Sequence, residues 1–375
     1  ARYLAKLVEE SLPLKRRQEA EAASEFCSSL THGIQTALVS HEEVHEWAHG
    51  RKAAMIFSVS HAWETREHPD PCRFQLQQIV NCTGLYGCAY HADIWVFYDY
   101  TSLFQFKRQS AAQEDSFRRS MGNMHVMYSH ECTCTLRIQS LTPSDAWERM
   151  RQSEEGVPVF HVRSGEVTPL PLQDLTKNDT PYGVRGWCMA EMEWSSARSD
   201  TSLHQRIDPS EVSSTEKSEL RGRVTTHPSS FKEQMAKAAF THRSDAESVV
   251  HLQKKIFYEK VTACEELRLS QLPPDQILAL ANALPDYSAL KVLRLVDFEC
   301  GDAEAEKFVE ARPLVNMGCR SQSTSCRTAF CRGDLQRMNL RDSGDSSECA
   351  RPWIGTRRSR KSISGPAPGR AAVPW

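Results

Sequence analysis

Residues 185–195 read Arg-Gly-Trp-Cys-Met-Ala-Glu-Met-Glu-Trp-Ser and decide how the rest of the chain is interpreted. The segment follows turn-forming residues, and its apolar residues Trp187, Ala190 and Trp194 recur at helical spacing. We therefore predict a short helix with a wide apolar face. Glu191 borders that face, so its carboxylate must either reach water at the helix rim or be held in a pocket for a chemical purpose.

Composition is typical of a soluble globular protein that is long enough for two domains. The 375 residues are 40% hydrophobic and 25% charged, and no run of about 18 apolar residues predicts a transmembrane helix. The net charge of -2 gives no general attraction to nucleic acid or to an anionic membrane, so we expect neither as a partner. The 13 cysteines are irregularly spaced, as free thiols are, and no signal-peptide pattern begins the sequence. We expect a cytoplasmic protein.

Strand and helix patterns alternate upstream of the Trp187 helix. Residues 53–64, 93–99 and 132–138 suit buried strands, and helical spacing at 74–80 and 116–128 separates them. This order predicts an α/β domain with a doubly wound parallel sheet, which we assign to residues 51–198. In such sheets, ligand-binding residues gather at the carboxyl ends of the strands.

A helical N-terminal extension is predicted over residues 1–50, because apolar residues that include Phe26 and Ile34 recur at helical spacing. Within it, the sequence His-Glu-Glu-Val-His at 41–45 matches the two-histidine pattern of zinc proteases. No third-ligand pattern accompanies it. We interpret this segment as a charged helix face and expect no metal site.

Downstream of the sheet domain, residues 199–228 are rich in Ser, Thr, Glu and Arg and are predicted to be a linker. Residues 229–312 begin with amphipathic helix and then contain Leu267-Arg268-Leu269, which recurs as Leu293-Arg294-Leu295 after about 26 residues. This pattern resembles the start of a ribonuclease-inhibitor-type leucine-rich repeat, an α/β solenoid that implies recognition of protein partners. From residue 313 to 375 the periodicity stops, and we expect a basic tail that is disordered or results from an aberrant gene model.

The sheet domain resembles the HET (heterokaryon incompatibility) domain and, more distantly, the TIR domain. The resemblance rests on motifs in matching order: Ser60-His61-Ala62-Trp63, Asp99 with Gln105, Met124 to Tyr128, and Arg185-Gly186-Trp187-Cys188-Met189-Ala190-Glu191. Two departures are His61, where HET domains have Tyr, and Gly186, where they have another small or a hydrophobic residue. The Trp-Cys-x-x-Glu part is also similar to the TIR helix whose Glu is catalytic in the members that cleave NAD.

The resemblance implies an intracellular signalling protein of the innate-immunity type. The first of two functions that it implies is hydrolysis of NAD, which is then the substrate and not a cofactor. Glu191 is then the candidate catalytic carboxylate. Its candidate substrate-binding partners are Ser60, His61, Trp63, Asp99, Arg185, Trp187 and Cys188. The alternative is an adaptor that acts through self-association of the sheet domain and through its repeats, in which Trp63 and Trp187 are core residues and Glu191 pairs with Arg185 or Arg198.

Overall fold

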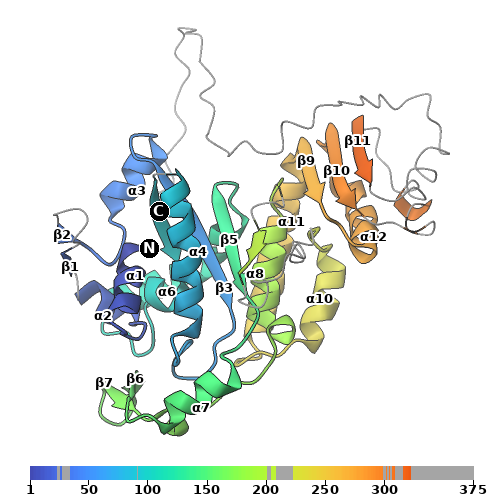
Figure 1. The fold of residues 1–375 in the computed structure, drawn as a ribbon. Coiled ribbons are helices and arrows are strands. Elements are labelled where there is room, and N and C mark those ends of the chain that lie inside the picture. Colours follow the sequence, from blue (N-terminus) through green and yellow to red (C-terminus); the bar gives the residue numbers. More distant parts are fainter. Residues whose placement is uncertain are drawn as a thin grey trace. The chain divides into compact units, whose positions relative to one another are not determined.

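A four-stranded parallel sheet forms the centre of the domain that carries the predicted site (Figure 1). Its strand order is β4-β3-β5-β8, and every neighbouring pair is parallel. The strands are β3 Ala54–His61, β4 Asp93–Phe97, β5 Thr133–Ile138 and β8 His204–Arg206. The first strand of the sheet in sequence therefore lies inside it, and the chain changes direction across the sheet beside β3. This confirms the predicted parallel α/β sheet.

The computed structural model places these strands within the unit Ala1–Leu340. The residues that the structure describes are 1–22, 26–27, 34–90, 92–200, 204–207, 223–298, 301, 304, 306–308 and 316–321.

Helices pack against both faces of the sheet because the strands alternate their side chains between two faces. On one face, Phe57 and Val59 of β3 pack against α4, Phe74–Tyr90, which itself contacts α1, Arg2–Glu9. On the other face, Ser58 and Ser60 point toward α8, Gly186–Ser196, and α6, Ala111–Ser129, lies beside α8. The two apolar layers leave the polar residues of β3 gathered under α8.

The N-terminal extension is only partly helical. It contains α1, α2 Arg17–Ala22 and α3 His41–Ala48, but β1 Phe26–Cys27 and β2 Ile34–Gln35 form an antiparallel pair between them. The prediction of helix through Phe26 and Ile34 is therefore wrong. In α3, Ser40 and Glu43 form a reciprocal capping box, and Glu43 Oε1 accepts a hydrogen bond from Lys52 Nζ at 2.7 Å. The contacts of Glu43 thus fix the helix start.

Shorter elements connect β5 to α8. They are α7 Ser144–Gln152, the antiparallel pair β6 Val157–His161 and β7 Glu166–Leu170, and the 3-10 turns η1 Leu172–Asp174 and η2 Tyr182–Val184. The turn α5, Asp99–Ser102, follows β4 directly. These connections bring η2 and α5 to the edge of the sheet where β3 ends.

The C-terminal part contains a second parallel sheet of three strands, β9 Glu266–Ser270, β10 Val292–Phe298 and β11 Asn316–Ser321, which lie side by side (Figure 1). Helix α12, Pro274–Ala283, and the turn η4, Leu284–Asp286, connect β9 to β10. The helices α10 Pro228–Lys237 and α11 Asp245–Ala263 precede this sheet.

The repeated Leu-Arg-Leu segments pair in register. Leu267 lies opposite Leu293 and Leu269 lies opposite Leu295, and each of these four leucines is at most 2% exposed. The repeat in the sequence therefore becomes one continuous apolar layer. Two strands fall outside the expected domain plan: β11 lies within 313–375, and β8 lies within the predicted linker 199–228. The remainder of the predicted tail is outside the described residues.

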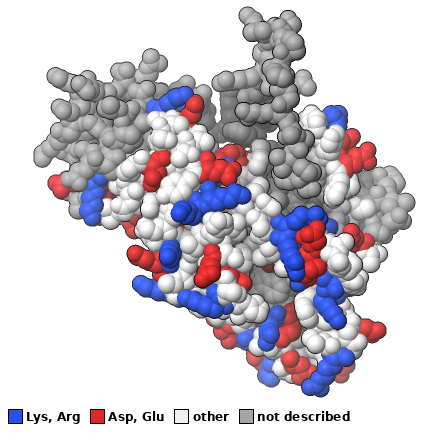
Figure 2. All heavy atoms as spheres, turned by 180° about the vertical axis from the view of Figure 1, so that it is seen from behind, with Lys and Arg blue, Asp and Glu red and all other residues white. Residues whose placement is uncertain are grey.

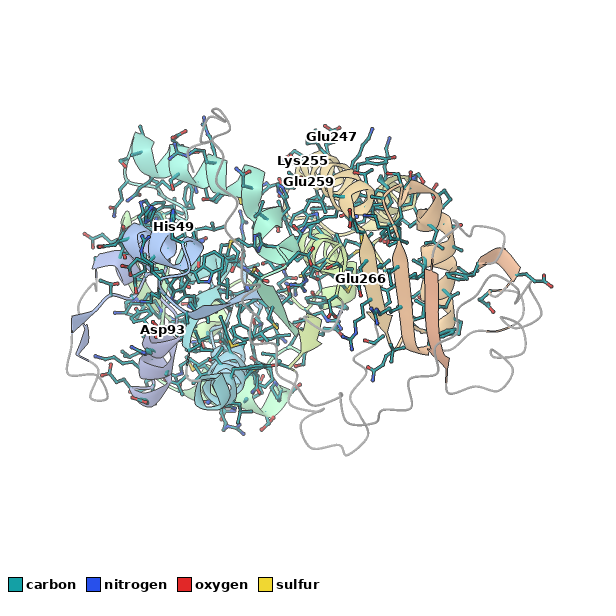
Figure 3. All side chains as sticks on the ribbon, turned by 90° about the horizontal axis from the view of Figure 1, so that it is seen from above. His49, Asp93, Glu247, Lys255, Glu259 and Glu266 are labelled. Carbon is teal, nitrogen blue, oxygen red and sulfur yellow. The ribbon has the colours of Figure 1, made fainter. Side chains whose placement is uncertain are left out.

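The described helices include none that is long and apolar enough to cross a membrane. Acidic and basic side chains are interspersed on the face shown in Figure 2, as expected for a chain with nearly balanced charge. Figure 3 shows Glu247, Lys255 and Glu259 projecting outward from α11, whose opposite side contributes Val249, Ile256 and other residues to the apolar core.

Candidate functional site

Three sequence-predicted residues meet at one edge of the sheet because parallel strands end on the same side. Ser60 and His61 are the last residues of β3, and Asp99 is the first residue of α5, directly after β4. Glu191 reaches the same place from the middle of α8. This edge lies beside β3, where the chain reverses direction across the sheet, and such positions are where open α/β sheets bind ligands.

Glu191 is held by hydroxyl groups. Ser60 Oγ donates a hydrogen bond to Glu191 Oε2 at 2.6 Å, and the hydroxyl of Tyr128 is a further hydrogen-bond partner of the carboxyl group. The hydroxyl of Tyr182 lies 2.6 Å from Ser60 Oγ. Because the Ser60 proton is directed to Glu191, Tyr182 donates to Ser60. Glu191 is 7% exposed, and its burial raises the pKa of the carboxyl group to about 8. The group therefore carries a proton at pH 7.

His61 and Asp99 form an ion pair beside Glu191. His61 Nε2 lies 2.9 Å from Asp99 Oδ1, and Trp63 Nε1 donates to Asp99 Oδ2 at 2.9 Å. Burial by itself lowers the pKa of His61, but the Asp99 carboxylate outweighs it and the pKa is raised. Burial conversely raises the pKa of Asp99, and His61 with its hydrogen bonds outweighs that effect, so the pKa is lowered. Each shift stabilises the charged form of that partner.

Solvent reaches this group of residues from the Asp99 side. The side chain of Asp99 is 24% exposed and Trp63 is half-buried, whereas Ser60 is fully buried. Asp99 and Trp63 are therefore more accessible to solvent than Ser60.

Arg185 and Cys188 hold the backbone at the end of β3. Arg185 Nη1 donates to the carbonyl oxygen of Trp63, and its other guanidinium nitrogens donate to the carbonyl oxygens of Thr180 and Asn178. Cys188 Sγ donates to the carbonyl oxygen of His61 at 3.2 Å. These contacts give both residues a positioning role. The alternative in which Glu191 pairs with Arg185 or Arg198 does not match these contacts. Arg185 donates to the three carbonyl oxygens named above, and Arg198 donates to those of Ser195 and Thr133.

Trp187 does not join the other candidates. Its indole Nε1 donates to Asp245 Oδ2 of α11 at 3.0 Å, and its ring lies 6.3 Å from that of Trp194 in a T-shaped arrangement. Trp187 packs against the apolar core between α8, α10 and α11. Its contacts fit the interpretation of Trp187 as a core residue.

Three residues of this cluster, Tyr182, Gln75 and Glu64, are not predicted by any sequence motif. Gln75 Oε1 lies 2.8 Å from His61 Nδ1, and Glu64 accepts hydrogen bonds from the backbone nitrogen and the hydroxyl of Thr142. Burial raises the pKa of Glu64. None of the three stands in a motif, and only the turn that ends in η2 brings Tyr182 to Ser60. Their contacts, and not their spacing, place them in this cluster.

The chemistry of the site is that of two carboxyl groups of different charge around one histidine. Among the described residues, no group of three His, Cys, Asp or Glu side chains is arranged to hold a metal ion. Comparisons with protein-family models, with curated proteins and with solved structures found no match to this chain.

Proposed function

We propose that the sheet domain hydrolyses the N-glycosidic bond of NAD, that Glu191 is its catalytic carboxylate, and that the protein acts in intracellular signalling. The observation that carries the proposal is the position of Glu191, a buried carboxyl group of raised pKa at the carboxyl edge of a parallel sheet. The resemblance to HET and TIR domains supports it, since the matching motifs contribute Ser60, Asp99 and Glu191 to one site.

The charge of the substrate explains how a protonated carboxyl group can act. The nicotinamide ring of NAD is cationic, and a cation next to Glu191 lowers the pKa of the carboxyl group, so that it ionises when the substrate binds. As the bond between the ribose anomeric carbon and the ring nitrogen breaks, its electron pair neutralises the ring and positive charge develops on the ribose. The Glu191 carboxylate stabilises that charge. Water then adds to the anomeric carbon, which gives ADP-ribose, nicotinamide and one proton.

The neighbouring residues have distinct parts in this proposal. Ser60 fixes the carboxyl group of Glu191 through the 2.6 Å hydrogen bond. Asp99 faces the solvent side and is placed to accept hydrogen bonds from ribose hydroxyls. The indole of Trp63, tied to Asp99, offers a flat surface at the entrance for the nicotinamide ring.

The test is the release of nicotinamide by the full-length chain at high protein concentration, followed by chromatography. We expect turnover in the parent protein and a loss of at least about 100-fold in Glu191→Gln, because one stabilising charge is removed from the transition state. Glu259→Gln is the matched control, since Glu259 is exposed on the outward side of α11 (Figure 3). Equal turnover in the parent and in Glu191→Gln would refute the assignment.

The pH dependence gives a second readout. We expect kcat/KM to rise with pH with a midpoint of about 8, because the free enzyme must lose the Glu191 proton. We expect the midpoint of kcat to lie lower, since the cationic ring is already bound.

The second candidate function is that of an adaptor. It is favoured by the sheet of β9, β10 and β11, which contains the repeated Leu-Arg-Leu segments and is called the repeat sheet below. Glu266, Arg268 and Arg294 alternate with the buried leucines of β9 and β10 and are exposed, so they present a polar row to a protein partner. Absence of nicotinamide release, together with concentration-dependent self-association of both the parent and Glu191→Gln in sedimentation experiments, would favour this function.

A further inference from the structure

The His61 ring has a hydrogen-bond partner at each of its two nitrogens. Nε2 lies 2.9 Å from Asp99 Oδ1, and Nδ1 lies 2.8 Å from Gln75 Oε1. A neutral imidazole has one donor and one acceptor nitrogen, and an imidazolium has two donors. The charge of His61 therefore depends on whether both partners can only accept.

Gln75 has its amide orientation fixed by its other contacts. Gln75 Nε2 donates to the carbonyl oxygen of Ala62 at 2.8 Å and to Glu64 Oε1 at 3.3 Å. A carbonyl oxygen only accepts, so the amino group must face Ala62 and the amide oxygen must face His61. Nδ1 of His61 is consequently a donor.

Asp99 is likewise an acceptor. Oδ2 accepts from the indole of Trp63 at 2.9 Å, and Oδ1 accepts from the backbone nitrogen of Tyr100 at 2.6 Å. Two donors that are independent of His61 stabilise the ionised form of the Asp99 carboxyl group. Nε2 of His61 is then also a donor.

We propose that Gln75 is a positioning residue that keeps His61 doubly protonated, so that the site contains a fixed imidazolium between Asp99 and Glu191. The ring of Tyr98 supports the cation, because it stacks on His61 at a centroid distance of 4.4 Å and an angle of 17°. Tyr98 contributes a further polar atom, since its hydroxyl lies 3.4 Å from Nδ1.

The charged and titratable groups around His61 come from every neighbouring element. They are Glu64 after β3, Asp70 before α4, Tyr98 and Asp99 at the end of β4, and Cys188 and Glu191 on α8. Of the carboxyl groups, Asp99 makes the direct hydrogen bond to the His61 ring. Its carboxylate offsets the cost of burying the cation.

The role of Gln75 in catalysis rests on the proposed function. An imidazolium next to Glu191 makes it easier to ionise that carboxyl group, and His61 indeed lowers the pKa of Glu191 while burial raises it. Loss of the imidazolium would therefore move the pH midpoint of kcat/KM upward. Gln75 itself does not reach the substrate, because it is fully buried behind His61.

The experiment measures the ring nitrogens of His61 by NMR in the full-length protein labelled with ¹⁵N-histidine. The His61 signals are identified by their loss in His61→Gln. We expect imidazolium shifts in the parent protein at neutral pH. In Gln75→Leu, which removes the acceptor, the midpoint of His61 deprotonation should fall by about one pH unit, a tenfold change in the protonation equilibrium.

Gln75→Glu separates this role from a merely structural one. Gln75→Glu restores an acceptor at Nδ1 but removes the donors to Ala62 and Glu64. If Gln75 had only a structural role, both variants would lose the imidazolium. The proposed role predicts that Gln75→Glu keeps it. A neutral His61 ring in the parent, or an unchanged midpoint in Gln75→Leu, would overturn the inference. If Gln75→Leu does not fold, the spectra of the parent and of Gln75→Glu still decide.

The NMR result is independent of turnover. An imidazolium that depends on Gln75 in a protein without NAD hydrolysis would refute the proposed function and leave this inference standing. NAD turnover in a protein whose His61 ring is neutral would support the proposed function and refute this inference.

Discussion

Replacing Glu191 with Gln should make the folded protein more stable as well as inactive. The pKa of Glu191 is raised from 4.5 to about 8 in the folded state because burial disfavours the carboxylate. The folded state therefore binds this proton more tightly than the unfolded state does. The resulting contribution to stability is complete below about pH 4.5 and is lost as the pH rises through about 8. A glutamine has no proton to lose.

The expected magnitude follows from this difference. Between pH 4.5 and 8, the parent should lose about 1.4 kcal/mol of unfolding free energy per pH unit relative to Glu191→Gln. Between about pH 5 and about pH 7.5 the gap should widen by about 3 kcal/mol. Glu191 is 7% exposed, so little of this effect is screened by water. The amide keeps the size of the protonated carboxyl group and an oxygen that can accept from Ser60.

Urea denaturation of both proteins across this pH range tests the prediction. Glu259→Gln removes one negative charge from the exposed side of α11 and controls for the change in net charge. Asp70, whose pKa burial raises to about 7, contributes with the same sign in every variant and cancels in the comparison. A gap between the parent and Glu191→Gln that stays constant with pH would refute the argument for a protonated, buried Glu191.

Three further predictions concern the packing of α8 and of the sheet formed by β9, β10 and β11. Gly186→Ala would place its Cβ 2.0 Å from the ring of Phe240, so it should cost about 1–3 kcal/mol in thermal or urea unfolding, and Phe240→Ala should reduce that cost. Asp245→Asn weakens the 3.0 Å hydrogen bond from Trp187 and should lower the free energy of unfolding by about 1 kcal/mol. The rate of nicotinamide release should not change, and a large loss of rate would place Trp187 in the site. Leu295→Ala empties a fully buried position in the repeat sheet and should cost about 2–5 kcal/mol, whereas a cost near zero would mean that this sheet does not contribute to the core.

The sequence predicts those parts of the fold in which periodicity is strong. Strands β3, β4 and β5 are apolar runs, and the helix that carries Glu191 shows its apolar face through Ala190 and Trp194. Strand β8 has the sequence His-Gln-Arg and no such run, because its place is set by backbone pairing with β5. Short polar strands of this kind leave no signal in the sequence.

The candidate site was predictable at the ends of strands and less so elsewhere. Ser60 and Asp99 follow from the rule that ligands bind at the carboxyl ends of parallel strands. Trp187 stands four residues before Glu191, so helical spacing places the two on the same face of the helix. Only the hydrogen bond from the indole to Asp245 of α11 shows that it is directed away from the site. Gln75 belongs to the first turn of α4, and no rule of spacing connects it with His61.

Because α8 is packed on two sides, the sheet domain cannot be cut from the chain directly after this helix without exposing apolar side chains. One side holds Glu191, and the other is covered by α10 and α11, which lead into the repeat sheet. A fragment that stops at residue 198 would keep the candidate catalytic group and leave Trp187 and Trp194 without their cover. Domain shuffling would therefore have to transfer α10 and α11 together with the sheet. The folding unit thus extends beyond residues 51–198, the range predicted from the motifs.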